Sequence, residues 1–160
     1  KNSENLGNGL FTVREDPRVL PFGKLLRKTK INEIPQLINI LIGDMSIVGP
    51  RPLVYNPYKN GVGERVFNSR PGLTGIGSIV FRDEELLLSK TSMDKKEFLD
   101  NHISPFKGEL ELWYQSKKSF QVDMKIIFLT LWVVFFPKSG IIERWFTNLP
   151  NMPDSIKNLT

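Results

Sequence analysis

The feature that constrains the fold most is an apolar repeat with helical spacing that stands between a proline and a glycine. The apolar positions at i, i+3, i+4 and i+7 are Ile34, Leu37, Ile38 and Leu41. They predict an amphipathic helix over about residues 31–42. Pro35 fits only the first turn of such a helix, and Gly43 is a typical stop at its C-terminal end. Asn32 and Glu33 are therefore expected at the helix N-terminus.

The N-terminus of a helix favours negative charge, because its first backbone N–H groups have no partner and the helix dipole is positive there. Two interpretations of Asn32 and Glu33 follow. They could simply cap the helix, with a carboxylate that the dipole favours. Alternatively, Glu33 could be held where a phosphate is also attracted, together with a divalent metal ion. The spacing alone leaves both open.

An arginine between two prolines is the second candidate for chemistry. Residues 45–48 are expected to form a short extended segment, which Gly49-Pro50 ends. Arg51 follows, and Pro52 stiffens its other side. A stiff backbone that presents a guanidinium group suits bidentate binding of a phosphate, although an ordinary surface arginine fits the pattern equally well.

The remaining sequence predicts a mostly helical chain with a few short strands. Helices are expected over residues 53–69, 106–117 and 122–136, a loop over 70–78, and a β-prone stretch over 79–81. We therefore predict one small α+β domain that comprises residues 1–160.

The apolar segment 122–136 has two interpretations. It could belong to the core, or its aromatic side chains could lie against a membrane interface. Its longest apolar run, Met124 to Phe136, is interrupted by Lys125 and Thr130 and at about 13 residues falls short of the roughly 18–20 residues that span a bilayer.

Composition excludes several classes of function. The chain has no cysteine and one histidine, so thiolate metal sites, cysteine nucleophiles and imidazole clusters are ruled out. Its net charge of +5 suits a partner that carries phosphate, without choosing among nucleotide, lipid and nucleic acid. No nucleic-acid-binding motif is present, and we expect no such partner.

Longer stretches of the sequence resemble the bacterial sugar transferase family, the monotopic phosphoglycosyl transferases. The strongest resemblance lies in residues 26–39 and 43–52, and it extends to Asp16-Pro17-Arg18 and to residues 70–75. It implies transfer of a hexose-1-phosphate from a UDP-sugar to undecaprenyl phosphate at the cytoplasmic face of the bacterial inner membrane. Mg²⁺ would be the cofactor, and surface polysaccharide synthesis, such as O-antigen or capsule, the pathway class.

The resemblance also implies roles for individual residues. Glu33 is expected to handle a proton or bind the metal, and Asn32 occupies the place of the family's nucleophilic aspartate. Arg51 is the leading phosphate-binding residue. The second group of candidates for organising that site is Arg14, Asp16, Arg18, Arg27 and Asp44. The expected partners are the UDP-sugar, undecaprenyl phosphate, the membrane surface and, as an option, a second copy of the chain.

The chain departs from the family pattern in three places. Asn32 is a poor nucleophile, so a non-catalytic module that binds a nucleotide sugar or a partner is the alternative function. The family's N-terminal membrane-inserting segment is expected to precede Lys1, in which case this sequence is a truncated form. Residues 76–85 also differ from the common family form Trp-Ala-Gln-Val-Asn-Gly-Arg, so the sugar could differ.

Overall fold

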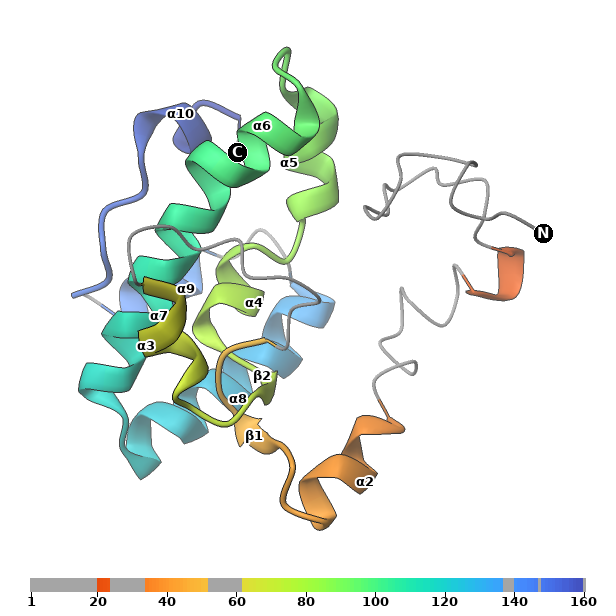
Figure 1. Cartoon of the computed structure of the whole chain (residues 1–160), viewed down its shortest axis with the longest axis vertical. Coiled ribbons are helices and arrows are strands. Elements are labelled where there is room, and N and C mark those ends of the chain that lie inside the picture. The colour runs from red at the N-terminus through yellow and green to blue at the C-terminus, as the bar shows by residue number, and fades with distance from the viewer. Residues whose placement is uncertain (1–19, 24–33, 52–61, 137–139, 147, 160) are drawn as a thin grey trace.

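A computed structural model describes residues 20–23, 34–51, 62–136, 140–146 and 148–159. Within them the chain is mostly helical and contains one small parallel sheet, as the α+β prediction requires (Figure 1). The elements are α2 (Gln36–Leu41), β1 (Ser46–Val48), α3 (Val62–Phe67), β2 (Gly72–Thr74), α4 (Ile76–Val80), α5 (Glu84–Lys90), α6 (Lys95–Phe98), the π-helix η3 (Leu99–Ile103), α7 (Ser104–Lys117), α8 (Phe120–Phe135), α9 (Ile141–Trp145) and α10 (Asp154–Lys157).

The sheet pairs two segments that are far apart in the sequence. β1 and β2 are parallel, with Ser46 opposite Gly72 and Val48 opposite Thr74. The predicted extended segment at 45–48 is thus confirmed, whereas the predicted loop at 70–78 is wrong, because it contains β2 and most of α4. The β-prone residues 79–81 are wrong too, since Ile79 and Val80 are helical. Strand pairing and packing outweigh local propensity here.

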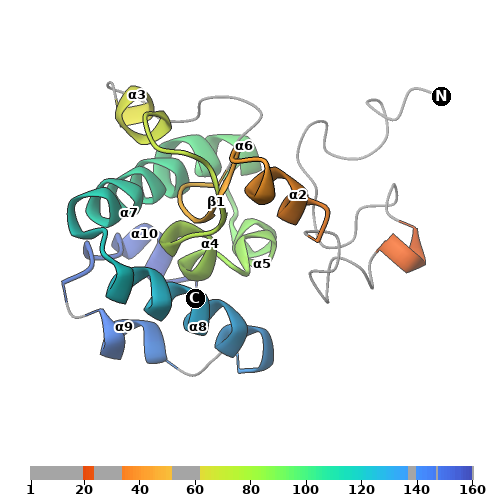
Figure 2. The ribbon, with the colours of Figure 1, turned by 90° about the horizontal axis from the view of Figure 1, so that it is seen from below.

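α4 lies between α7 and α8 and contacts both, and the two predicted helices are confirmed, each beginning two residues earlier than predicted (Figure 2). α8 begins after Ser119, whose hydroxyl accepts a hydrogen bond from the N–H of Val122, the usual geometry of a helix N-cap. Its inner side buries Ile126, Leu129 and Val133. The apolar core also includes Phe106, Leu110 and Tyr114 of α7, together with residues of α4, α5, η3 and α10.

The outer side of α8 is also apolar. The exposed apolar residues at helical spacing are Phe120, Met124, Phe128, Leu131 and Phe135. Of these residues, Phe128 also stacks on Trp145 of α9, with a distance of 5.1 Å between the ring centroids. A helix that is apolar on all sides normally has both sides covered. Across the described ranges, no helix has the length and apolar character needed to cross a bilayer.

α2 lies at the edge of the molecule and buries none of its residues (Figure 1). The helix begins at Gln36, directly after Pro35, so the prediction that Pro35 lies in the first turn is wrong. Its C-terminal stop is confirmed, because Gly43 adopts a left-handed φ of 89°. The predicted apolar stripe exists, but its four side chains are exposed.

Candidate functional site

The chain turns across β2 directly after β1. The N–H of Gly49 donates to the carbonyl of Thr74 (2.9 Å), and the N–H of Gly72 donates to the carbonyl of Pro50 (2.8 Å). Gly49 and Pro50 are buried, whereas Arg51 is exposed. Two backbone hydrogen bonds with β2 therefore hold the two residues directly before Arg51.

The crossing is so close that it depends on glycines. A Cβ placed on Gly49 would lie 2.6 Å from the carbonyl oxygen of Arg70. A Cβ on Gly72 would overlap the backbone of Gly49, and one on Gly75 would overlap the Gly49 carbonyl oxygen. Because these neighbours are backbone atoms, they have little freedom to move away. The glycines of segment 70–75 thus serve close packing against Gly49.

Helix α8 supports β2 through a pair of threonines. The hydroxyl oxygens of Thr74 and Thr130 are 2.6 Å apart. Since the Thr130 hydroxyl donates to the carbonyl of Ile126 at 2.8 Å, we assign the other hydrogen bond to the Thr74 hydroxyl as donor. The strand that holds Gly49 is thereby connected to the centre of the core.

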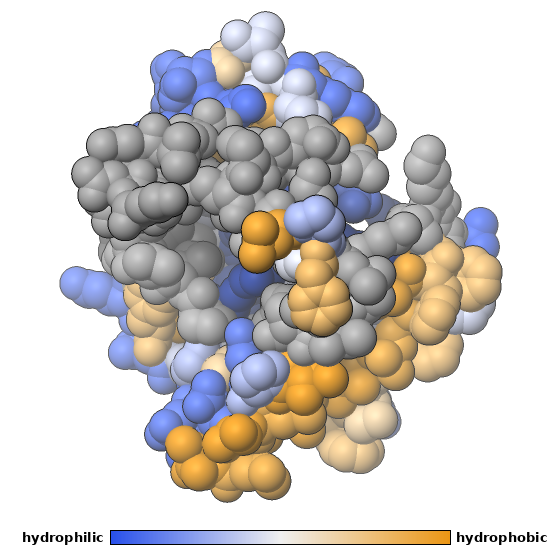
Figure 3. Space-filling model, turned by 90° about the vertical axis from the view of Figure 1, so that its right-hand side faces the viewer, coloured by the Kyte–Doolittle hydropathy of each residue, from blue (hydrophilic) through white to orange (hydrophobic). Residues whose placement is uncertain are grey.

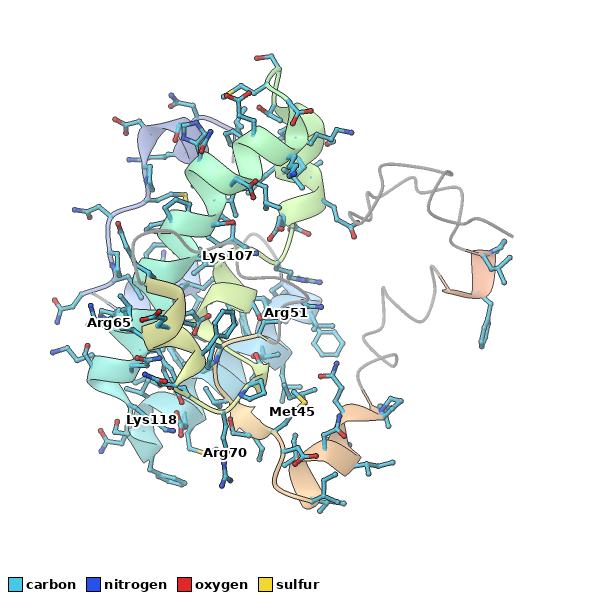
Figure 4. The ribbon with its side chains drawn as sticks, in the orientation of Figure 1. Met45, Arg51, Arg65, Arg70, Lys107 and Lys118 are labelled. Carbon is cyan, nitrogen blue, oxygen red and sulfur yellow. The ribbon has the colours of Figure 1, made fainter. Side chains whose placement is uncertain are left out.

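Arg51, a site residue predicted from the sequence, directly follows the two residues that are hydrogen-bonded to β2. Figure 4 shows it on the side of the domain that faces α2, above Met45, while Arg65 on α3 lies on the opposite side. An exposed guanidinium group on a fixed backbone can form two parallel hydrogen bonds to a phosphate. The geometry is thus compatible with the predicted phosphate contact.

Asp44 belongs to the turn that ends α2. The N–H groups of Asp44 and Met45 both donate to the carbonyl of Asn39, at 2.9 and 3.0 Å, and the Asp44 side chain is exposed. Asp44 therefore precedes β1, and Arg51 follows it. These two are the predicted site residues within the described ranges.

The other predicted site residues lie outside the described residues. They are Arg14, Asp16, Arg18, Arg27, Asn32 and Glu33. The described chain resumes with Ile34 and Pro35 in a turn that leads into α2. Within the described part, no three or more His, Asp or Glu side chains are grouped so that they could hold a metal ion.

A buried carboxylate next to this framework escaped the sequence analysis. Glu111 of α7 is 3% exposed and accepts a hydrogen bond from the N–H of Gly77. Burial raises its pKa from 4.5 to about 7, and the Gly77 N–H and the charge of Lys107 offset this only in part. The signal was available: position 111 falls inside the apolar stripe of α7, between Leu110 and Tyr114.

Tyr114 continues this polar set one turn further along α7. Its hydroxyl donates to Oδ1 of Asp123 at 2.6 Å, which joins α7 to α8. The hydroxyl also lies 3.5 Å from the carbonyl of Val48, at the end of β1. Burial, the hydrogen bond to Asp123 and the charges of Asp123 and Glu111 all raise the pKa of Tyr114. The phenol therefore stays protonated and acts as a donor.

The chain matches known proteins over most of its length. The family model described as Bacterial sugar transferase matches residues 1–137. The galactosyl transferase CpsE of Streptococcus agalactiae serotype III is 36% identical over 129 residues, 78% of this chain and 25% of that protein. The UDP-glucose:undecaprenyl-phosphate glucose-1-phosphate transferase of Klebsiella pneumoniae is 34% identical over 143 residues, 86% of this chain and 28% of that protein.

A shorter match has higher identity. The exopolysaccharide production protein ExoY of Sinorhizobium fredii is 42% identical over 84 residues, 51% of this chain and 37% of that protein. The chain thus spans about a quarter to just over a third of the length of these curated relatives.

Proposed function

This chain belongs to the bacterial sugar transferase family, and we propose that it transfers a hexose-1-phosphate from a UDP-sugar to undecaprenyl phosphate. In this reaction the bond between the phosphorus next to the sugar and the bridging oxygen breaks, and UMP leaves. A new bond forms from the same phosphorus to a phosphate oxygen of the lipid. The product would begin a surface polysaccharide such as an O-antigen or a capsule.

The observation that carries this proposal is the family match over residues 1–137, together with the names of relatives that act on these two substrates. One relative is named a UDP-glucose:undecaprenyl-phosphate glucose-1-phosphate transferase, and another an undecaprenyl-phosphate galactose phosphotransferase. One name specifies glucose and the other galactose, so we propose a hexose for this chain without specifying which one.

Arg51 is our candidate for binding the diphosphate. Its guanidinium group would neutralise charge on the phosphate oxygens, and the Gly49–Thr74 and Gly72–Pro50 hydrogen bonds would keep it in place. Replacing Arg51 with Ala should raise the KM for the UDP-sugar by roughly 10- to 100-fold, because charge-assisted hydrogen bonds are lost. Arg65→Ala, on the far side of the domain, is the matched control, and an equal effect there would contradict the assignment.

Asn32 is the reason to consider a second function, because it replaces the family's nucleophilic aspartate. A neutral amide is a poor nucleophile, so an active enzyme would use Glu33 or a direct attack by the lipid phosphate. The alternative is a member of the family that binds a nucleotide sugar or a partner without turning it over. Glu33 is also the residue that we propose for Mg²⁺, whose general role would be to stabilise phosphate charge.

We also propose that the protein works at the cytoplasmic face of the inner membrane. The support is an apolar face, which we define as the exposed side of α2 with Ile47 of β1 and the outer side of α8. β1 follows α2 in the chain and contacts α8, and Ile47 of this strand is half exposed. In Figure 3 apolar side chains gather along the lower part of the side that carries α2. An apolar surface of this kind suits contact with lipid.

Vesicle binding tests the apolar face. Leu131→Glu places a charge on the outer side of α8, where the side chain is exposed, so the fold should persist while binding to anionic vesicles weakens. Met93→Glu, between α5 and α6, adds the same charge at another exposed apolar side chain. Equal vesicle binding by both variants would reject the membrane contact.

UMP release tests the function itself. The full-length protein in a membrane mimic should release UMP when it is given undecaprenyl phosphate, Mg²⁺ and the correct member of a panel of UDP-sugars. Turnover that requires Glu33 and survives Asn32→Ala would establish an enzyme without the usual nucleophile. A chelator should abolish that turnover if Mg²⁺ takes part.

The same assay separates the alternative function. UDP-sugar binding without turnover on any sugar would favour the non-catalytic module. Turnover that appears only after Asn32→Asp would favour it as well, because that change restores the family's nucleophile. Turnover by the wild-type protein would exclude it.

A further inference from the structure

The buried face of α7 contains an acid where apolar side chains are the rule. Glu111 is 3% exposed, and its neighbours on this face, Leu110 and Tyr114, are each 1% exposed. Carboxyl groups are rarely buried this deeply unless they form specific hydrogen bonds. Glu111 thus calls for an explanation other than core packing.

Only one half of this carboxyl group has a hydrogen-bond partner. The N–H of Gly77 donates to it, while Oε2 is buried without a partner among the described residues. Lys107, the nearby cation, forms an ion pair with Glu84 of α5. Lys107 therefore does not neutralise Glu111 directly, and the contact that locates the carboxyl group is with α4.

The contact between Glu111 and α4 leaves no room for a side chain at position 77. A Cβ on Gly77 would lie 2.6 Å from Oε1 of Glu111, closer than real Cβ atoms approach. Gly77 is the second residue of the short helix α4, and the buried end of the Glu111 side chain would have to shift to admit a methyl group at this position. Residue 77 and residue 111 therefore form a matched pair.

This pair lies directly behind the segment that carries Arg51. Gly77 belongs to the first turn of α4, and Gly75 immediately precedes that helix. The α-carbon of Gly75 faces the carbonyl oxygen of Gly49, and the preceding Thr74 accepts the N–H of Gly49. A shift of the first turn of α4 would consequently move Gly49, two residues before Arg51.

We propose that Glu111 is a positioning residue, which holds the first turn of α4 through Gly77 and thereby fixes the Gly49–Arg51 segment. The proposal deepens the proposed function, on which it rests for the assumption that Arg51 binds the diphosphate of the substrate. Glu111 itself touches no reacting atom and acts through Gly77, Gly75 and Gly49.

Amide hydrogen exchange measures how firmly the Gly49–Arg51 segment is held, and the measurement does not require enzymatic activity. The measured quantity is the exchange rate of the Gly49 and Gly72 N–H groups divided by that of the Leu129 N–H in the core. Gly77→Ala should raise this ratio by about fivefold or more, because the new methyl group displaces the carboxyl group and opens the turn locally. Glu111→Gln keeps an acceptor for Gly77 and should leave the ratio within about twofold of wild type.

The decisive variant removes the acceptor. Glu111→Leu has a similar volume but cannot accept the N–H of Gly77, so it should raise the ratio by about fivefold or more, in contrast to Glu111→Gln. Ile156→Ala, in the core at α10, is the control for general destabilisation and should not change the ratio.

Two results would overturn the proposal. One is an unchanged exchange ratio in Gly77→Ala, and the other is an unchanged ratio in Glu111→Leu. In an active protein, the KM for the UDP-sugar should rise in Gly77→Ala and in Glu111→Leu but not in Glu111→Gln, whereas a merely structural role would leave KM unchanged. If the wild-type protein neither binds nor turns over any UDP-sugar, the proposed function fails alone, because the exchange ratio still tests Glu111.

Discussion

α2 and α7 are both amphipathic by sequence, yet the fold treats them in opposite ways. α2 has a regular apolar stripe and buries none of it, and Leu41 is 86% exposed. α7 has a stripe interrupted by an acid, and the acid is buried with its apolar neighbours. The spacing of apolar residues predicts a helix in both cases, but it does not predict what covers the stripe.

Both exceptions lie near the segment that presents Arg51. The turn at the end of α2 leads into β1, and Glu111 of α7 contacts the first turn of α4 behind Gly49. Natural proteins accept such local conflicts mostly where function requires them. The exposed stripe of α2 is explained by a lipid surface and the buried acid of α7 by the positioning of Arg51, both as proposed above.

The largest expected effect is a difference in how much α7 and α2 contribute to the free energy of unfolding. Leu110→Ala on α7 removes a fully buried side chain and should lower the free energy of unfolding by about 2–5 kcal/mol. Leu41→Ala on α2 should change it by less than about 0.5 kcal/mol. Urea denaturation in the absence of lipid measures both. A large loss in Leu41→Ala would break the comparison, because it would mean that α2 packs on the folded chain.

The next effect concerns pH and the buried acid. The pKa of Glu111 is raised from 4.5 in the unfolded chain to about 7, so the folded state binds its proton more tightly. Its contribution to stability is therefore full below pH 4.5 and is lost as pH rises through 7, an overall change of about 3 kcal/mol. Glu111→Gln removes this dependence, because the amide does not titrate.

The comparison of wild type and Glu111→Gln isolates this group. Denaturation at several pH values between 4.5 and 8 should show that wild type loses stability relative to the variant. The other charges around Glu111 are Lys107, which pairs with Glu84, and Asp123, which accepts a hydrogen bond from Tyr114. They are the same in both proteins and largely cancel in the difference. Parallel curves would refute the assignment of a raised pKa.

The smallest effect concerns how the helices begin. α8 follows Ser119, whose side chain accepts a backbone hydrogen bond, whereas α2 follows Pro35, which provides no side-chain cap. Ser119→Ala should lower the free energy of unfolding by about 1 kcal/mol. Ser92→Ala, at an exposed serine between α5 and α6, should have almost no effect in the same measurement. Equal effects would show that the cap at Ser119 is not important.

Much of the local structure follows from the sequence because its signals are local. Helical spacing located α7 and α8, the Gly-Pro pair ended β1, and Gly43 ended α2. The sequence predicts a loop over 70–78, whereas β2 forms there through its pairing with β1 more than twenty residues away. The glycines there meet the backbone of Gly49, a close approach that only the folded structure reveals.

The candidate site divides in the same way. Arg51, between two prolines, and the family resemblance of residues 26–52 are visible in the sequence, because they depend on residue identity and order. Glu111, Gly77 and the Thr74–Thr130 pair are not, because each depends on elements brought together by packing. The sequence by itself determined the family and the helices α7 and α8, whereas only the tertiary structure decided which apolar stripe is exposed and which acid is buried. Burial and close contact are properties of neighbours in space, and no local pattern contains them.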